Sequence, residues 1–212
     1  MALWARSGLR PQDIAFDEIL AAEPTQVLDA ECGRGELAAR LVHAGVDVIA
    51  LDQSERMVEL THARGVDARI GDAQALPFAD GEFDVAVANF MLYHVPDVQR
   101  ALGELGRVLR PNGTLVAATN GVRQLAELWE LVGRDLSDRS KLFMRETGEE
   151  FLKRVFGHIR CIPLDGAVEL TADDMRAYIA SSVAHKGAVD AVPDFEGTRI
   201  VTTSSAVFIA TR

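Results

Sequence analysis

The stretch VLDAECGRG, from Val27 to Gly35, decides the fold. Its apolar start predicts a short buried strand, and the glycines after it indicate a turn that leads into a helix. Such a turn presents free backbone N–H groups at a helix N-terminus, where a nucleoside cofactor can bind. Glu31 is the unusual residue in this turn, because a bulky anion stands where the backbone should approach a ligand closely.

A second apolar run, from Val46 to Leu51, ends on Asp52. A carboxylate that closes the strand after a glycine turn can hold both ribose hydroxyls, so Asp52 is predicted to bind a nucleoside. The alternatives are a glycine turn that binds no ligand and an aspartate that competes with Ser54 to cap the next helix. The glycine turn and Asp52 together favour the nucleoside.

Asp72 ends a third short strand and is predicted to lie at the same edge of the sheet as Asp52. There its carboxylate could accept a hydrogen bond from an adenine amino group. The alternative is a turn carboxylate that caps its own backbone. With the glycine turn and Asp52, Asp72 fits an adenosine.

Length and composition limit the class of protein. A chain of 212 residues that is 48% hydrophobic predicts one globular domain, and the net charge of −10 argues against a nucleic-acid partner. Two cysteines without a CxxC pair predict neither a disulfide nor a metal site. No apolar run is long enough to span a membrane, and MALWARSGLRPQ lacks the apolar core of a signal peptide, so we expect a cytoplasmic protein.

Strands and helices are predicted to alternate along the chain. The expected strands cover residues 27–30, 46–52, 67–73, 83–90, 114–120, 158–166 and 204–212. The expected helices cover residues 11–22, 35–43, 54–64, 98–109, 122–132 and 149–156, with another starting at Thr171 and a basic connector over 134–145. This alternation predicts an α/β fold: a Rossmann-like, doubly wound, mostly parallel sheet of about seven strands, with an antiparallel C-terminal hairpin at its edge.

The chain is therefore interpreted as one domain in three parts. Residues 1–26 hold an N-terminal helix, residues 27–120 form the cofactor-binding half, and residues 121–212 form a C-terminal half that could contact the acceptor.

Four segments in this order resemble the class I S-adenosylmethionine-dependent methyltransferases, of the methyltransferase type 11 group. They are VLDAECGRG, VIALDQSERM, GDAQALPFADGEFDVAVANFMLYHVPD and RVLRPNGTLVAATN. The resemblance covers residues 27–120 and implies methyl transfer from S-adenosylmethionine to a small-molecule acceptor, with S-adenosylhomocysteine as product, by a monomer or homodimer. It also implies which residues contact the cofactor: Asp29, Ala30, Cys32, Gly33 and Gly35 around the methionine part, Asp52 on the ribose, Gln53 and Met57 beside the adenine or ribose, Asp72 and Ala73 at the adenine edge, and Asn89 near the amino group.

Two residues after the fourth strand are candidates for the catalytic side. His94 titrates near neutral pH and lies where the methyl group should emerge, so it could act as a base, while Tyr93 could orient the acceptor. The alternative for both is packing beneath the next helix.

Glu31 departs from the family, which usually has a small residue there, although Arg34 could offset its charge. Two other classes of protein therefore stay open. One is a non-catalytic binding or partner protein on a methyltransferase scaffold. The other is an NAD-dependent oxidoreductase, because GRGELA fits a dinucleotide fingerprint, although a YxxxK pair and a second nucleotide-binding half are missing.

Overall fold

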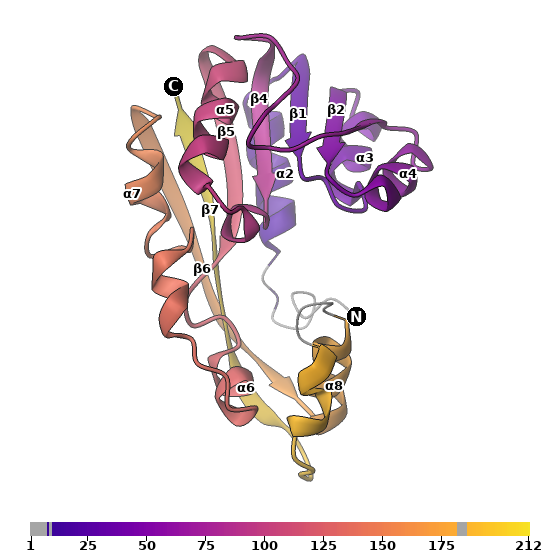
Figure 1. Cartoon of the computed structure of the whole chain (residues 1–212), viewed down its shortest axis with the longest axis vertical. Coiled ribbons are helices and arrows are strands. Elements are labelled where there is room, and N and C mark those ends of the chain that lie inside the picture. The colour runs from indigo at the N-terminus through magenta and orange to yellow at the C-terminus, as the bar shows by residue number, and fades with distance from the viewer. Residues whose placement is uncertain (1–7, 9, 182–185) are drawn as a thin grey trace.

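A computed structural model describes residues 8, 10–181 and 186–212, and in it a single mixed sheet organises the chain (Figure 1). The strands are β1 (Gln26–Ala30), β2 (Asp47–Asp52), β3 (Asp67–Ile70), β4 (Phe83–Asn89), β5 (Leu109–Asn120), β6 (His158–Leu170) and β7 (Arg199–Thr211). Their spatial order is β3-β2-β1-β4-β5-β7-β6. The first five strands are parallel, and β7 runs antiparallel to both β5 and β6. The predicted parallel sheet with an antiparallel hairpin at its edge is confirmed.

Helices cover both faces of this sheet. They are α2 (Pro11–Ala21), α3 (Glu36–His43), α4 (Glu55–His62), α5 (Val98–Val108), α6 (Ala126–Leu131), α7 (Gly148–Leu152) and α8 (Ala172–Ala180), with 3₁₀-helices η1 (Leu92–His94), η2 (Ser137–Lys141) and η3 (Lys186–Ala191). No helix in the described ranges is long and apolar enough to cross a membrane.

The strands carry apolar side chains on both faces because each face meets a helical layer. In β1, Leu28 joins the core under α5 and α7, whereas its neighbour Val27 joins the core under α2 and α3. Figure 1 shows these two layers on opposite sides of the upper part of the sheet. The uninterrupted apolar runs in the sequence thus come from strands buried on both sides.

The hairpin of β6 and β7 continues beyond the end of β5. Pairing between β5 and β7 stops at Asn120 and Ser205, whereas β6 and β7 stay paired as far as Leu170 and Arg199. The far end carries α6, α8 and η3, which share a separate apolar core (Figure 1). We call α6, α8, η3 and the far ends of β6 and β7 the C-terminal lobe.

Several predicted boundaries in the C-terminal half were wrong. Both late strands are longer than predicted, because they pair with each other beyond the sheet. The helix predicted over 122–132 begins only at Ala126. Before it, Leu125 is left-handed and donates its backbone N–H to the Thr202 carbonyl, so pairing with β7 replaces the first helical turn.

Asp84, near the start of β4, ties together three segments and is expected to make stability depend on acid pH. Burial opposes its charge, but hydrogen bonds from Thr25, Gln26 and Arg110 lower the pKa of Asp84 to about 2. A depressed folded-state pKa gives stability that is present above the unfolded pKa of about 4 and is lost as the pH falls towards 2. We expect Asp84→Asn to lower the free energy of unfolding by about 2 kcal/mol at neutral pH.

Urea denaturation at neutral pH and at pH near 2 measures this effect. The difference between Asp84→Asn and the unaltered chain should shrink at the lower pH. Asp67→Asn is the control, because Asp67 is exposed and, among the described residues, its side-chain hydrogen bonds and ion pair all come from Arg69, two residues away. Equal losses for the two variants would contradict the assignment.

Candidate functional site

The glycine turn folds over the end of β2 and fixes the buried carboxylate of Asp52. The Cys32 N–H donates to the Leu51 carbonyl. Asp52 accepts hydrogen bonds from the Gly33 N–H (2.9 Å) and the Ser54 N–H (2.8 Å). Ser54 caps α4 by accepting from the Met57 N–H, so the expected capping role belongs to Ser54. Asp52 thus joins the glycine turn to the start of α4.

Gly35 is required where α3 begins. It adopts φ +69°, and a Cβ there would lie 2.5 Å from Thr61 Oγ1. Thr61 is fully buried and donates to the Gly33 carbonyl (3.2 Å), so its side chain cannot move aside for a Cβ at Gly35. The close packing of α4 against this turn therefore depends on glycine.

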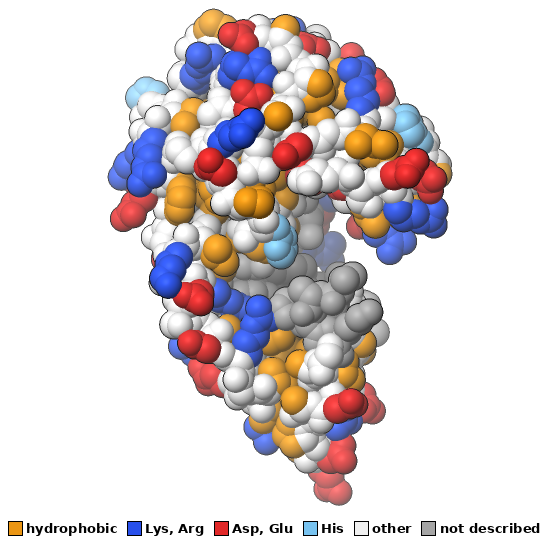
Figure 2. All heavy atoms as spheres, viewed as in Figure 1, with side chains coloured by type: hydrophobic (Ala, Val, Ile, Leu, Met, Phe, Trp, Pro, Cys, Tyr) orange, Lys and Arg blue, Asp and Glu red, His pale blue; other side chains and the backbone are white. Residues whose placement is uncertain are grey.

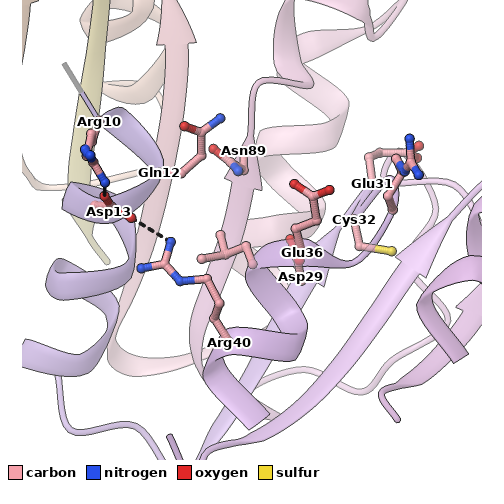
Figure 3. Close-up of a pocket in the computed structure, with 11 residues that line it drawn as sticks. Arg10, Gln12, Asp13, Asp29, Glu31, Cys32, Glu36, Arg40 and Asn89 are labelled. Carbon is pink, nitrogen blue, oxygen red and sulfur yellow. Dashed lines mark ion pairs between the residues drawn. The ribbon is translucent and has the colours of Figure 1, made fainter. Parts of the chain in front are cut away.

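Two cavities open beside this turn at the carboxyl edge of the sheet. The larger, of about 460 Å³, lies between the turn, the end of β4 and the starts of α2 and α3 (Figure 3). Its lining residues are Arg10, Gln12, Asp13, Asp29, Glu31, Cys32, Arg34, Glu36, Leu37, Arg40 and Asn89. The smaller, of about 350 Å³, is lined by Glu31, Cys32, Gly33, Gln53, Asn89, Phe90, Met91, His94 and Val95. Glu31, Cys32 and Asn89 line both cavities and so mark their junction.

Two buried polar atoms at this edge have no hydrogen-bond partner among the described residues. They are Oδ2 of Asp29 and Oδ1 of Asn89, and both residues line the larger cavity. Burial, with the Asp52 carboxylate nearby, raises the pKa of Asp29 to about 7. An unpartnered buried acceptor costs free energy unless a ligand donates to it, so the pair is suited to a cationic amino group.

The Glu31 carboxylate accepts hydrogen bonds from two groups that were predicted to bind adenosine. Glu31 has φ +54°, and its Oε1 accepts from Gln53 Nε2 (3.1 Å) and from the Ala73 N–H (3.4 Å). Burial and the charge of Asp52 raise the pKa of Glu31, although these hydrogen bonds oppose the shift. Glu31 is thus strained, is crowded by a like charge and competes for Gln53 and Ala73.

The predicted residues divide by whether they line one of these two cavities. The residues that do are Asp29, Cys32, Gly33, Gln53, Asn89 and His94, and those that line neither are Ala30, Gly35, Asp52, Met57, Asp72, Ala73 and Tyr93. The Asp72 carboxylate accepts from the backbone and side chain of Gln74, as in the alternative of a self-capping turn. Its predicted contact with adenine remains a prediction.

The sequence did not indicate the contribution of α2 to the larger cavity. Asp13 at its start forms an ion pair with Arg40 of α3 (2.8 Å), and Arg10 and Gln12 line the α2 side of the cavity, across from Glu31 and Cys32 (Figure 3). Asp13 was predicted to lie in the first turn of a helix, but no sequence pattern predicted that it would pair with Arg40 of α3.

Cys32 and Tyr93 are both held in their neutral forms. Burial, with the Asp29 carboxylate, raises the pKa of the Cys32 thiol to about 12, so Cys32 is not a thiolate nucleophile. Burial also raises the pKa of Tyr93, and it lowers that of the exposed His94. The two rings lie 4.4 Å apart between centroids. The described residues contain no cluster that could hold a metal ion.

Fold and site together define the class of protein. A glycine turn after β1, an acidic residue at the end of β2 and an antiparallel β7 beside a parallel sheet are features of the Rossmann-like methyltransferase fold. The dinucleotide fold instead places a second parallel half at that side of the sheet.

Comparison with known proteins agrees with this class. A family model described as a methyltransferase domain matches residues 28–117. A demethylmenaquinone methyltransferase of Renibacterium salmoninarum is 39% identical over 107 residues, which are 50% of this chain and 45% of that protein. A malonyl-[acyl-carrier protein] O-methyltransferase of Erwinia pyrifoliae is 37% identical over 116 residues, 51% of this chain and 44% of that protein. The chain thus spans about half the length of these relatives.

A solved structure extends the likeness to the whole fold. The YcgJ protein from Bacillus subtilis superposes with a TM-score of 0.69 at 17% identity, covering 94% of this chain and 98% of that one. Over residues 28–117 this chain is similar to the class I S-adenosylmethionine-dependent methyltransferases, and its whole fold is the one seen in YcgJ.

Proposed function

We propose that this protein transfers a methyl group from S-adenosylmethionine to a small-molecule acceptor. The observation that carries the proposal is the pair of unpartnered buried oxygens on Asp29 and Asn89, which line a cavity beside the glycine turn. The methionine end of the cofactor carries an ammonium group that can donate to them, and a carboxylate that suits the arginines of the same cavity.

The residues present fit S-adenosylmethionine, with one adjustment. Asp29 and Asn89 would hold the ammonium group and Asp52 the ribose hydroxyls, since each Asp52 oxygen has spare accepting capacity. Gln53 and the Ala73 N–H would contact the adenosine part once the Glu31 carboxylate leaves them. When bound, the cofactor supplies an electrophilic methyl group on a sulfonium.

The side chains on the acceptor side position the acceptor and take up its proton. His94 lines the smaller cavity, and its lowered pKa keeps its imidazole neutral near pH 7, so it can accept a proton from the acceptor. Tyr93 stays a neutral phenol that orients the acceptor through hydrogen bonds. Methyl transfer otherwise needs alignment and exclusion of water.

Methyl transfer is tested by following S-adenosylhomocysteine. The protein is incubated with methyl-labelled S-adenosylmethionine and a fraction of small metabolites. We expect protein-dependent S-adenosylhomocysteine and a labelled small product, with a rate lowered about 100-fold or more by His94→Gln. His62→Gln is the control, because His62 lies on α4 and lines neither cavity.

A second candidate is a binding protein that no longer catalyses, and the position of Glu31 favours it. Cofactor binding without any S-adenosylhomocysteine formation would support that candidate and contradict methyl transfer.

Asp29 is expected to couple cofactor binding to proton release. Its pKa of about 7 means that much of the carboxyl is protonated just below neutrality, whereas an ammonium ligand favours the carboxylate. Affinity should therefore rise as the pH increases through 7. Calorimetry in buffers of different ionisation enthalpy should detect release of about half a proton near pH 7.

Asp29→Asn should abolish this release, because an amide does not titrate in this range. Asp13→Asn is the matched control, since it removes a carboxylate that lines the same cavity but is paired with Arg40. Proton release that persists in Asp29→Asn would show that another group titrates.

A further inference from the structure

Arg139 of η2 is half-buried beside the C-terminal lobe and uses only part of its guanidinium within the protein. Its Nη1 donates to the carbonyls of Val122 (3.1 Å) and Gln124 (2.8 Å). Within the described ranges, Nη2 and Nε have no hydrogen-bond acceptor. Nη1 is thus held by the protein, while Nη2 and Nε keep donors that no described residue uses.

No carboxylate in the described part of the chain forms an ion pair with Arg139. Other partly buried arginines do have such partners: Arg107 pairs with two carboxylates, and so does Arg145. The charged and titratable groups that face Arg139 are Arg134, Tyr178 and Tyr93, and burial lowers the pKa of Arg139. The residues outside the described ranges, 1–7, 9 and 182–185, include no aspartate or glutamate whose side chain could pair with Arg139.

A guanidinium stays charged, so partial burial without an anion costs free energy that a bound anion would recover. Arg139 therefore differs from an arginine that closes a structural ion pair. Its free donors suit an oxyanion from outside the chain.

Aromatic side chains lie close to Arg139. The Arg139 guanidinium lies 5.9 Å from the ring of Trp129, and that ring lies 6.3 Å from the ring of Tyr178. Tyr93 interacts with Asn120 at the end of β5, and its ring packs on His94, which lines the smaller cavity. These contacts connect the C-terminal lobe to the proposed methyl-transfer site, and Figure 2 shows that the molecule narrows from its upper part to this lobe.

We propose that Arg139, with Tyr93 and Tyr178, forms the subsite for an oxyanion of the acceptor, close to the buried ring of Trp129. This subsite rests on the proposed function, because it describes the acceptor of the same reaction. A carboxylate and a phosphate share the required chemistry. The bidentate donors of the guanidinium match either one.

Trp129 fluorescence can test this subsite in the full-length chain. The chain has two tryptophans, and Trp4→Phe leaves Trp129 as the sole emitter. The probes are benzoate, phenyl phosphate and neutral benzamide. We expect saturable binding of benzoate or phenyl phosphate at least about tenfold tighter than that of benzamide, and the tighter of the two identifies the kind of oxyanion.

Arg139→Gln should weaken oxyanion binding about tenfold or more. Arg134→Gln is the matched control: exposed Arg134 stacks on Trp129 at 4.9 Å and faces Arg139, so Arg134→Gln removes the same charge but should weaken oxyanion binding less than Arg139→Gln does. Arg139 supports two backbone carbonyls, so Arg139→Lys provides a milder variant that keeps the charge but loses the bidentate donors. The comparison of benzoate with benzamide needs no variant at all.

Equal affinities for benzoate, phenyl phosphate and benzamide would overturn the subsite, as would no binding at millimolar concentration or equal losses in Arg139→Gln and Arg134→Gln. Titration of the same proteins with S-adenosylmethionine separates the two proposals. Cofactor binding without oxyanion selectivity overturns the subsite alone. Oxyanion selectivity without cofactor binding overturns the proposed methyl transfer and leaves an anion site.

Discussion

Asp52→Ala is expected to weaken S-adenosylmethionine binding about 100-fold or more, the equivalent of about 3 kcal/mol from two charge-assisted hydrogen bonds. The carboxylate is the predicted ribose ligand, and it also holds the Gly33 and Ser54 N–H groups in place. Its loss removes the ligand contact and loosens the glycine turn together. Isothermal titration calorimetry measures the affinity, and circular dichroism checks that the variant is folded.

Asp47→Ala is the matched control for Asp52→Ala. Asp47 is the exposed first residue of β2, at the opposite end of the same strand. Its removal changes the net charge equally and should leave cofactor affinity unchanged. An Asp52→Ala protein that binds the cofactor as tightly as the unaltered chain would exclude Asp52 from the binding site.

Glu31→Gly is expected to tighten S-adenosylmethionine binding about tenfold or more, because three costs disappear together. Glycine adopts φ +54° without strain, Gln53 and the Ala73 N–H become free, and the like charge beside Asp52 is removed. Calorimetric titration of both proteins at the same pH measures the gain.

Two further variants identify which cost matters. Glu31→Gln removes the charge but keeps a side chain in the strained turn, so it should recover only part of the gain. Glu36→Gln removes a carboxylate from the same cavity and should have little effect, because among the described residues Glu36 makes only a long ion pair with Arg64 (3.7 Å). Weaker binding by Glu31→Gly would instead mean that Glu31 holds the cofactor.

The sequence predicted the parallel half of the fold well because local patterns determine it. Apolar runs buried on both faces and the Ser54 cap act within short segments, and the strands and helices of residues 26–109 lie close to the predicted ranges. The late elements depend on partners far along the chain. The Leu125 N–H donates to the Thr202 carbonyl, and no local sequence pattern predicts a contact between residues so far apart in the chain.

The candidate site was also predictable only in part. The places of the glycine turn, Asp52 and Glu31 relative to the predicted strands were enough to assign them to the site. The contacts of the Glu31 carboxylate with Gln53 and Ala73 depend on how three strand ends meet, which only the folded chain determines. The sequence predicted only a basic connector around Arg139. It could not single out Arg139, because only the tertiary structure shows which arginines have a carboxylate partner among the described residues.

Calorimetric titration of the unaltered chain and of Glu31→Gly with S-adenosylmethionine, S-adenosylhomocysteine and NAD tests the central claim most directly. We expect saturable binding of both adenosyl ligands at one site, tighter in Glu31→Gly, and no binding of NAD. Failure of both adenosyl ligands to bind either protein at millimolar concentration would contradict the assignment, and binding of NAD alone would point to an oxidoreductase.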